Sequence, residues 1–129
     1  MLNDPLANVL SGILNYDRVG KKLFTVHPAS RVVRKVLQIL NEQGYLGSTE
    51  VVTESRGGVV KVNLLGNINK CGVIKPRFSV TMGEYEKFEK RFLPAKGVGV
   101  LIVSTIKGMM THEEAKSQNL GGRLIAYCY

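Results

Sequence analysis

Residues 123–129 predict a strand that is apolar on both faces. Alternate positions carry apolar or aromatic side chains on each side: Leu124, Ala126 and Cys128 on one, and Ile125, Tyr127 and Tyr129 on the other. Such a strand needs covering elements on both faces, so it belongs in the middle of a sheet rather than at an edge. This requirement limits the chain to folds in which its last strand is central.

The segment before this strand predicts an ordered loop. An apolar run, Val98–Val103, leads to the hydroxyls of Ser104 and Thr105, and Lys107-Gly108 favours a tight cationic reversal because glycine accepts a positive φ. Thr111 and Glu114 have the spacing of a capping box, in which each side chain bonds the other residue's backbone amide. Taken alone, the segment favours a plain strand end and hairpin over a ligand contact.

The first half of the chain predicts an α-β-α-β-β lobe. Asn3 or Asp4 caps a helix with Pro5 at its first position, and one helical face carries Leu6, Val9, Leu10, Ile13 and Leu14. A strand at 22–26 precedes a second helix, Arg31–Gln43, which Gly44 should end. The expected inward residues of this second helix are Val33, Val36, Leu37 and Leu40. Residues 49–54 and 59–65 are β-branched runs joined by Ser55–Gly58, which predicts a hairpin.

After the polar segment Gly66–Gly72 the pattern predicts a second lobe, mainly β with short helices. We expect strands at 78–81, 98–104 and 123–129, a helix at 84–92 and a short helix after Thr111. The fold class is therefore α+β, with two small lobes at 1–66 and 67–129. The acidic residues Glu84, Glu86 and Glu89 alternate with basic ones, which is typical of a solvated helix face.

The charge distribution favours a polyanionic partner. The 129 residues contain 18 basic and 10 acidic side chains, a formal charge of +8. Residues 18–35 carry six basic side chains and residues 56–77 carry five, and neither stretch contains an acid. Basic zones of this kind are typical of nucleic-acid binding, although a merely solvated cationic surface remains an alternative.

The sequence gives little support to catalysis or a metal site. Cys71 and Cys128 are far apart in sequence and lack metal-ligand spacing, so we expect free thiols, with Cys128 as a small buried apolar residue. His27 and His112 are expected at the surface or in a capping turn. Neither Gly57-Gly58 nor Gly121-Gly122 has the spacing of a phosphate-binding loop. These residues lead us to expect a protein that is not an enzyme. No apolar stretch is long enough for a membrane span or a signal, so we also expect a cytoplasmic location.

Several motifs resemble one known family in their order along almost the whole chain. They are Asp4–Asn8, Pro28–Arg31, Gly44–Leu46, Lys75–Arg77 and Ser104–Ala115 followed by Gly121-Gly122-Arg123. This order resembles small-subunit ribosomal protein eight. Asn69–Gly72, Tyr85–Lys90 and His112–Ala115 are similar to its archaeal and eukaryotic branch. Ile106 stands where bacterial members usually carry a second serine, so a hydroxyl contact from that side chain is not implied here.

The resemblance implies a structural protein with no cofactor that binds the central domain of the small-subunit ribosomal RNA early in assembly. Its partners would include neighbouring ribosomal proteins and its own messenger RNA, which it would regulate. Thr111 and Glu114 would support the loop, while Phe78 is expected in the core. The RNA-binding residues would be Asp4, Pro5, Lys21, Lys22, Ser30, Arg31, Arg34, Lys75, Arg77, Ser104, Thr105, Lys107, Gly108, Gly121 and Gly122.

Two alternatives belong to other classes of protein. The first is a basic protein–protein interaction domain whose charge only maintains solubility, and the second is a small RNA-modifying enzyme. A nuclease-sensitive complex would distinguish an RNA partner from a protein partner. The enzyme would require loss of an activity on changing His27 or His112.

Overall fold

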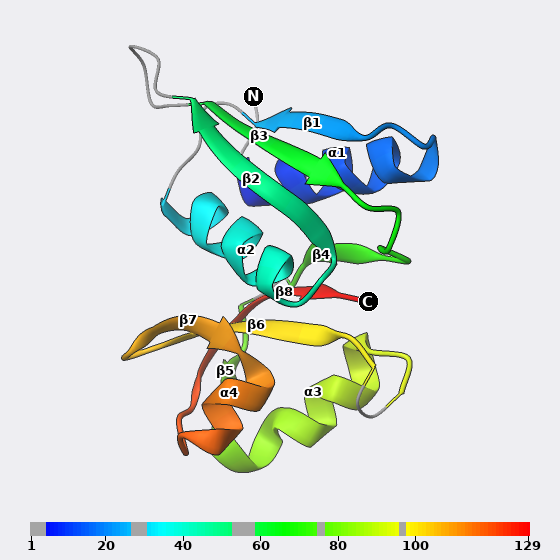
Figure 1. Ribbon diagram of the computed structural model, residues 1–129. Coiled ribbons are helices and arrows are strands. Elements are labelled where there is room, and N and C mark those ends of the chain that lie inside the picture. Colours follow the sequence, from blue (N-terminus) through cyan, green and yellow to red (C-terminus); the bar gives the residue numbers. More distant parts are fainter. Residues whose placement is uncertain (1–4, 27–30, 53–58, 75–76, 96–97) are drawn as a thin grey trace. The chain divides into compact units, whose positions relative to one another are not determined.

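The chain forms two compact units, Met1–Asn69 and Lys70–Tyr129. The computed structural model describes residues 5–26, 31–52, 59–74, 77–95 and 98–129. The division lies within the polar segment Gly66–Gly72. Both units combine helices with an antiparallel sheet, which confirms the predicted α+β class (Figure 1).

The first unit follows the predicted α-β-α-β-β order. It contains α1 (Pro5–Arg18), β1 (Leu23–Val26), α2 (Arg31–Glu42), β2 (Leu46–Val52) and β3 (Val59–Leu64). The antiparallel strands lie in the order β1-β3-β2. Helix α1 packs on β1, α2 packs on β2, and the two helices contact each other. The expected inward residues of α2 are buried, and so are Leu6, Leu10 and Ile13 of α1.

Glycines end both helices of this unit by the same motif. At α2, Gly44 has φ +84°, the Gly44 N–H donates to Asn41 O at 3.1 Å, and the Tyr45 N–H donates to Leu40 O at 3.0 Å. These two bonds satisfy carbonyls that the end of the helix leaves unpaired. Gly20, with φ +81°, ends α1 in the same way. The predicted stop at Gly44 is therefore confirmed.

The second unit is built around its last strand. It contains β4 (Cys71–Val73), β5 (Ser79–Val80), a 3-10 turn (Met82–Glu84), α3 (Tyr85–Phe92), β6 (Val100–Thr105), β7 (Gly108–Thr111), α4 (His112–Ser117) and β8 (Gly122–Cys128). The sheet order is β4-β8-β6-β7, and β5 also pairs with β8. Thus β8 is the central strand that its two apolar faces predicted. Strands β4 and β7 were not predicted.

The expected alternation along β8 is interrupted by a bulge. Ile102 lies opposite Ala126 and Val103 opposite Leu124, which leaves Ile125 as an extra residue. The carbonyl of Ile125 instead accepts the Ile74 N–H at 3.0 Å. Because the bulge shifts the alternation, Leu124 joins the same core cluster as Tyr127 and Tyr129, not the face of Ala126 and Cys128. The predicted grouping of Leu124 was wrong for this reason.

Two glycines permit close approach of backbones at the beginning of β8. A Cβ on Gly122 would overlap the carbonyl oxygen of Ser104, and a Cβ on Gly121 would lie 2.6 Å from the carbonyl oxygen of Val80. Strand β8 can therefore lie against β6 and β5 only with glycine at these positions. This packing role was not anticipated from the sequence.

We predict that Gly122→Ala lowers the free energy of unfolding by about 1–3 kcal/mol, because β8 and β6 must separate to admit the methyl group. Urea denaturation measures the change. The matched control is Gly83→Ala, since a Cβ on Gly83 meets no heavy atom within 4 Å. Equal losses in the two variants would contradict the close-packing explanation.

Candidate nucleic-acid interface

A two-residue turn joins β6 to β7 and presents exposed side chains. Thr105 pairs with Gly108, so Ile106 and Lys107 form the turn, one residue earlier than the predicted Lys107-Gly108 reversal. Ile106 is 92% exposed, and Lys107 is also exposed. Gly108 has φ +113° with no heavy atom within 4 Å of its Cβ position, so its backbone is open to a ligand.

The hydroxyl of Thr105 holds this turn together. It donates to the Gly108 carbonyl at 2.8 Å and accepts the Lys107 N–H at 3.1 Å. A hydroxyl has one donor and two acceptor sites, so only one acceptor site remains. Thr105 therefore acts first as an organiser of the turn, whereas the sequence suggested two equivalent hydroxyls beside each other.

Ser104 lies at the end of β6 with a different environment. It is half-buried between Met109 of β7 and Arg123 of β8, its partners in the two registers. No residue in the described ranges makes a side-chain hydrogen bond with its hydroxyl. Ser104 thus keeps its donor and acceptor sites available beside the rigid turn.

The predicted capping box at the other end of β7 is half present. The Thr111 hydroxyl is buried and accepts the Glu114 N–H at 3.3 Å. The exposed Glu114 side chain shows no reciprocal bond among the described residues, so the second half of that prediction was wrong. The kind of bond expected of the Glu114 side chain is made by Glu84 instead, whose carboxylate accepts hydrogen bonds from the backbone N–H and the hydroxyl of Thr81. These bonds lower the pKa of Glu84.

His112 lies in the capping turn at the beginning of α4, one of the two places predicted for it, but it is buried rather than at the surface. The residue is only 3% exposed, and its Nδ1 accepts the Leu101 N–H at 3.0 Å. Ile102–Thr111 is the last residue pair between β6 and β7, because the chain enters α4 at His112. The imidazole therefore gives the Leu101 N–H an acceptor just beyond the end of the strand pairing. Sequence inspection missed this bond because it depends on the path of β6.

A buried carboxylate completes the His112 contact. Glu89 of α3 is 6% exposed, and its Oε1 lies 3.4 Å from His112 Nε2 and bonds the Lys116 ammonium. Since Nδ1 accepts a hydrogen bond from the Leu101 N–H, the neutral ring carries its proton on Nε2, facing Glu89. Burial lowers the pKa of His112, and the Glu89 carboxylate opposes this effect. The expectation that Glu89 lies on a solvated face was wrong.

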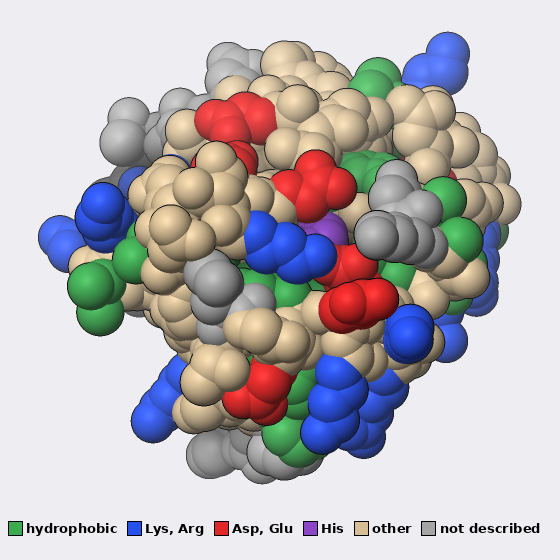
Figure 2. Space-filling model, turned by 90° about the horizontal axis from the view of Figure 1, so that it is seen from below, with side chains coloured by type: hydrophobic (Ala, Val, Ile, Leu, Met, Phe, Trp, Pro, Cys, Tyr) green, Lys and Arg blue, Asp and Glu red, His purple; other side chains and the backbone are tan. Residues whose placement is uncertain are grey.

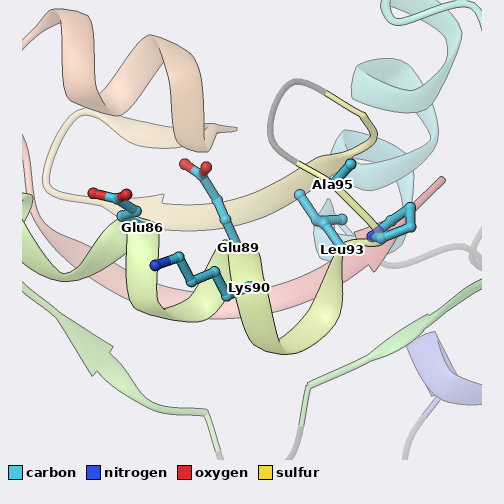
Figure 3. Close-up of a pocket in the computed structure, with 6 residues that line it drawn as sticks. Glu86, Glu89, Lys90, Leu93 and Ala95 are labelled. Carbon is cyan, nitrogen blue, oxygen red and sulfur yellow. The ribbon is translucent and has the colours of Figure 1, made fainter.

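Glu89 also lines a pocket of about 160 Å³ on α3. Figure 3 shows its side chain extending from α3 past β6 toward α4, with Glu86 and Lys90 beside it on the same helix. Leu93, Pro94 and Ala95 form the apolar part of the pocket. Figure 2 shows acidic and basic side chains close together on this side of the molecule. Among the residues described as lining this pocket, two carboxylates face one ammonium group, so they form no concentrated positive charge that would attract phosphates.

The first unit presents a separate group of cations. Arg31 and Arg34 are exposed one turn apart at the beginning of α2. Lys21 and Lys22 are exposed after α1, and the Lys21 ammonium lies 4.6 Å from the centre of the Tyr16 ring. A helix N-terminus beside guanidinium groups favours phosphate binding. Arg31 and Arg34 are thus one exposed pair of cations in this unit, and Lys21 and Lys22 are another.

The remaining predicted site residues are placed only in part. Asp4, Ser30 and Lys75 lie outside the described residues, and Pro5 begins α1. Arg77 is exposed in the second unit, and Phe78 packs against the core as expected. The guanidinium of Arg91, not that of Arg77, lies over Phe78 at 5.0 Å.

Comparison with known families identifies the class of protein. A family model described as Ribosomal protein S8 matches residues 4–129, nearly the whole chain. The chain belongs to the ribosomal protein S8 family. It is therefore a small-subunit ribosomal protein that binds ribosomal RNA, and it is located in the ribosome. Membership also argues against the solubility-domain alternative, because a protein of this family has ribosomal RNA as a partner.

Members of the S8 family are typically structural proteins rather than enzymes. Within the described ranges, no three His, Cys, Asp or Glu side chains gather into a set that could hold a metal ion. No helix in the described parts of the chain is long and apolar enough to cross a membrane. For the RNA that this family binds, the exposed turn at Ser104–Gly108 and the cations of α2 are the candidate contacts.

We predict that His112→Phe lowers the free energy of unfolding by about 1–3 kcal/mol at pH 8, because the Leu101 N–H loses its acceptor. The stabilisation by neutral His112 is complete above the ordinary pKa of 6.5 and is lost as the pH falls toward the lower pKa of the folded state. The difference between the wild-type protein and His112→Phe should therefore shrink from pH 8 to pH 5. Urea denaturation at several pH values tests this, and a constant difference would contradict it.

Proposed function

We propose that the β6–β7 turn of this S8 protein reads an irregular site in ribosomal RNA, while the beginning of α2 anchors phosphates. The observation that carries the proposal is the internal bonding of Thr105, which fixes the turn and leaves Ser104, Lys107 and the Gly108 backbone accessible. A ligand that binds a preorganised turn loses little conformational freedom in ordering it.

The groups on the turn suit RNA better than regular duplex DNA. A-form RNA presents 2′-hydroxyls and base edges in a wide, shallow minor groove, and irregular sites add unstacked bases. The Ser104 hydroxyl can donate and accept at a 2′-hydroxyl or base edge, and Gly108 lets backbone groups approach closely. The exposed Ile106 supplies an apolar contact in place of a hydroxyl.

The expected roles of Gly121 and Gly122 change in this proposal. Because both positions lie against backbone carbonyls, their glycines serve the RNA site by letting β8 support Ser104. Thr111 supports the turn from the other end of β7 through its bond to Glu114 N–H. Glu114 contributes its backbone rather than its carboxylate, which phosphates would repel.

The finer biological role rests on the resemblance described above. We infer that the RNA is the central domain of the small-subunit ribosomal RNA, that binding occurs early in assembly, and that the chain is of the archaeal type. Binding to its own messenger RNA would follow if that RNA copies the ribosomal site. The motifs Asn69–Gly72 and His112–Ala115 support the archaeal assignment.

We predict that Ser104→Ala weakens binding to a central-domain RNA fragment by about 1–3 kcal/mol without changing thermal stability, because only a ligand contact is lost. Thr105→Ala should weaken binding by a similar amount and also lower stability, since it removes the turn's internal bonds. Filter-binding titrations and thermal unfolding measure the two effects. Ser117→Ala, at an exposed position on α4, is the matched control. Normal binding by Ser104→Ala would contradict a contact through its hydroxyl.

We predict that Arg31→Ala weakens binding to ribosomal and scrambled RNA alike and makes the salt dependence less steep by about one unit of slope, because a phosphate contact is lost. Titrations of both RNAs at several salt concentrations measure this. Lys90→Ala removes the same charge from α3, where acids surround it, and should leave the slope unchanged. A change in sequence preference on Arg31→Ala would assign that residue to base reading instead.

A further inference from the structure

The two cysteines of the chain lie directly opposite each other on neighbouring strands. Cys71 of β4 is the antiparallel partner of Cys128 of β8. Directly opposite residues point to the same face of a sheet, with their Cβ atoms about 4.5–5.5 Å apart. The fold thus brings together two thiols that are far apart in sequence, and no disulfide joins them in the structure.

The adjacent hydrogen bonds define the geometry of this pair. The Lys70 N–H donates to Tyr129 O at 2.9 Å, and the Tyr129 N–H donates to Lys70 O at 2.8 Å. Lys70–Tyr129 is therefore a hydrogen-bonded pair, so the next pair, Cys71–Cys128, is a non-hydrogen-bonded one. Cα atoms in such pairs are about 4.5 Å apart, within the range of about 4.4–6.8 Å that a disulfide spans. The Cβ atoms of a non-hydrogen-bonded pair lie at the close end of the range given above, next to the upper limit of about 4.5 Å for a disulfide.

The position of β4 provides access to these buried thiols. Cys71 is 5% exposed and Cys128 is fully buried. Strand β4 has only three residues and lies at the edge of the sheet, whereas β8 is central. Short edge segments separate from a sheet at a lower free-energy cost than global unfolding. Such an opening exposes Cys71 while β8 stays paired with β6.

We propose that Cys71 and Cys128 form a reversible dithiol–disulfide pair whose oxidant is a low-molecular-weight disulfide such as oxidised glutathione. The Cys71 thiolate attacks one sulfur of the oxidant, forming a mixed disulfide and releasing one glutathione thiol. The Cys128 thiolate then attacks the Cys71 sulfur, forming the protein disulfide and releasing the second glutathione thiol. The two thiol protons end on the two glutathione molecules, so the protein loses two electrons and the oxidant gains them.

Oxidation would stabilise the second unit. Cys71 and Cys128 are the second and the penultimate residues of Lys70–Tyr129. Their disulfide therefore closes nearly the whole unit into one covalent loop and restricts the unfolded chain more than the folded one. This proposal does not depend on RNA binding, because Cys128 lies at the opposite end of β8 from Gly122, beside which Ser104 lies.

The test is to equilibrate the folded wild-type protein in glutathione buffers of increasing oxidised fraction. The samples are then quenched with acid, unfolded and alkylated for mass spectrometry. We expect both alkylation sites to disappear together, the mass to fall by two hydrogen atoms, and a thiol reductant to reverse the change. The oxidised protein should unfold at a temperature higher by about 10 °C or more.

The matched control is the double variant Cys71→Ser with Val73→Cys. It keeps two thiols and the same strand, but Val73 lies opposite Ala126, so the new thiol is out of register with Cys128. We expect no intramolecular disulfide in this folded variant. The proposal is overturned if wild-type thiols stay reduced in a buffer that oxidises the urea-unfolded chain. It is also overturned if the control oxidises as readily, or if oxidation lowers the unfolding temperature.

Discussion

The burial of both faces of β8 is the constraint on which the second unit depends. Three strands, β4, β5 and β6, hydrogen-bond to it, so its position determines theirs. The bulge at Ile125 and the glycine at position 122 are local adjustments that let these neighbours fit against one strand. Because Gly122 lies against Ser104, the same packing also fixes where the β6–β7 turn begins.

Regular periodicity made much of the fold predictable. The apolar faces of α1 and α2, the stop at Gly44 and the central place of β8 follow from patterns within single segments. Strand β4 was missed because three residues containing Gly72 carry no clear pattern, and its pairing comes from β8. Strand β7 was missed because the sequence placed Gly108, its first residue, in the turn, and the three residues that follow are too few to show a strand pattern.

The candidate site was predictable as a segment but not as a set of roles. Ser104, Thr105 and Lys107 do lie together at one turn, yet only the folded turn distinguishes Thr105, whose hydroxyl is engaged in internal bonds, from Ser104. His112 and Glu89 were misjudged for a related reason. Each is polar and lies on a short helix, where solvent exposure is the usual expectation, but elements distant in sequence bury them together.

The arrangement of charge and rigidity suggests a division of labour in RNA binding. Exposed cations such as Arg31 and Lys21 attract any phosphate backbone, so by themselves they give affinity without sequence preference. Preference requires groups held at fixed positions, and the turn has them because Thr105 closes it while His112 and Thr111 secure the elements behind it. A flexible turn with the same residues would lose conformational entropy on binding any RNA and would discriminate less sharply between the matching irregular site and other RNA. In the proposed function, the buried polar bonds behind the turn therefore contribute to RNA specificity without themselves contacting RNA.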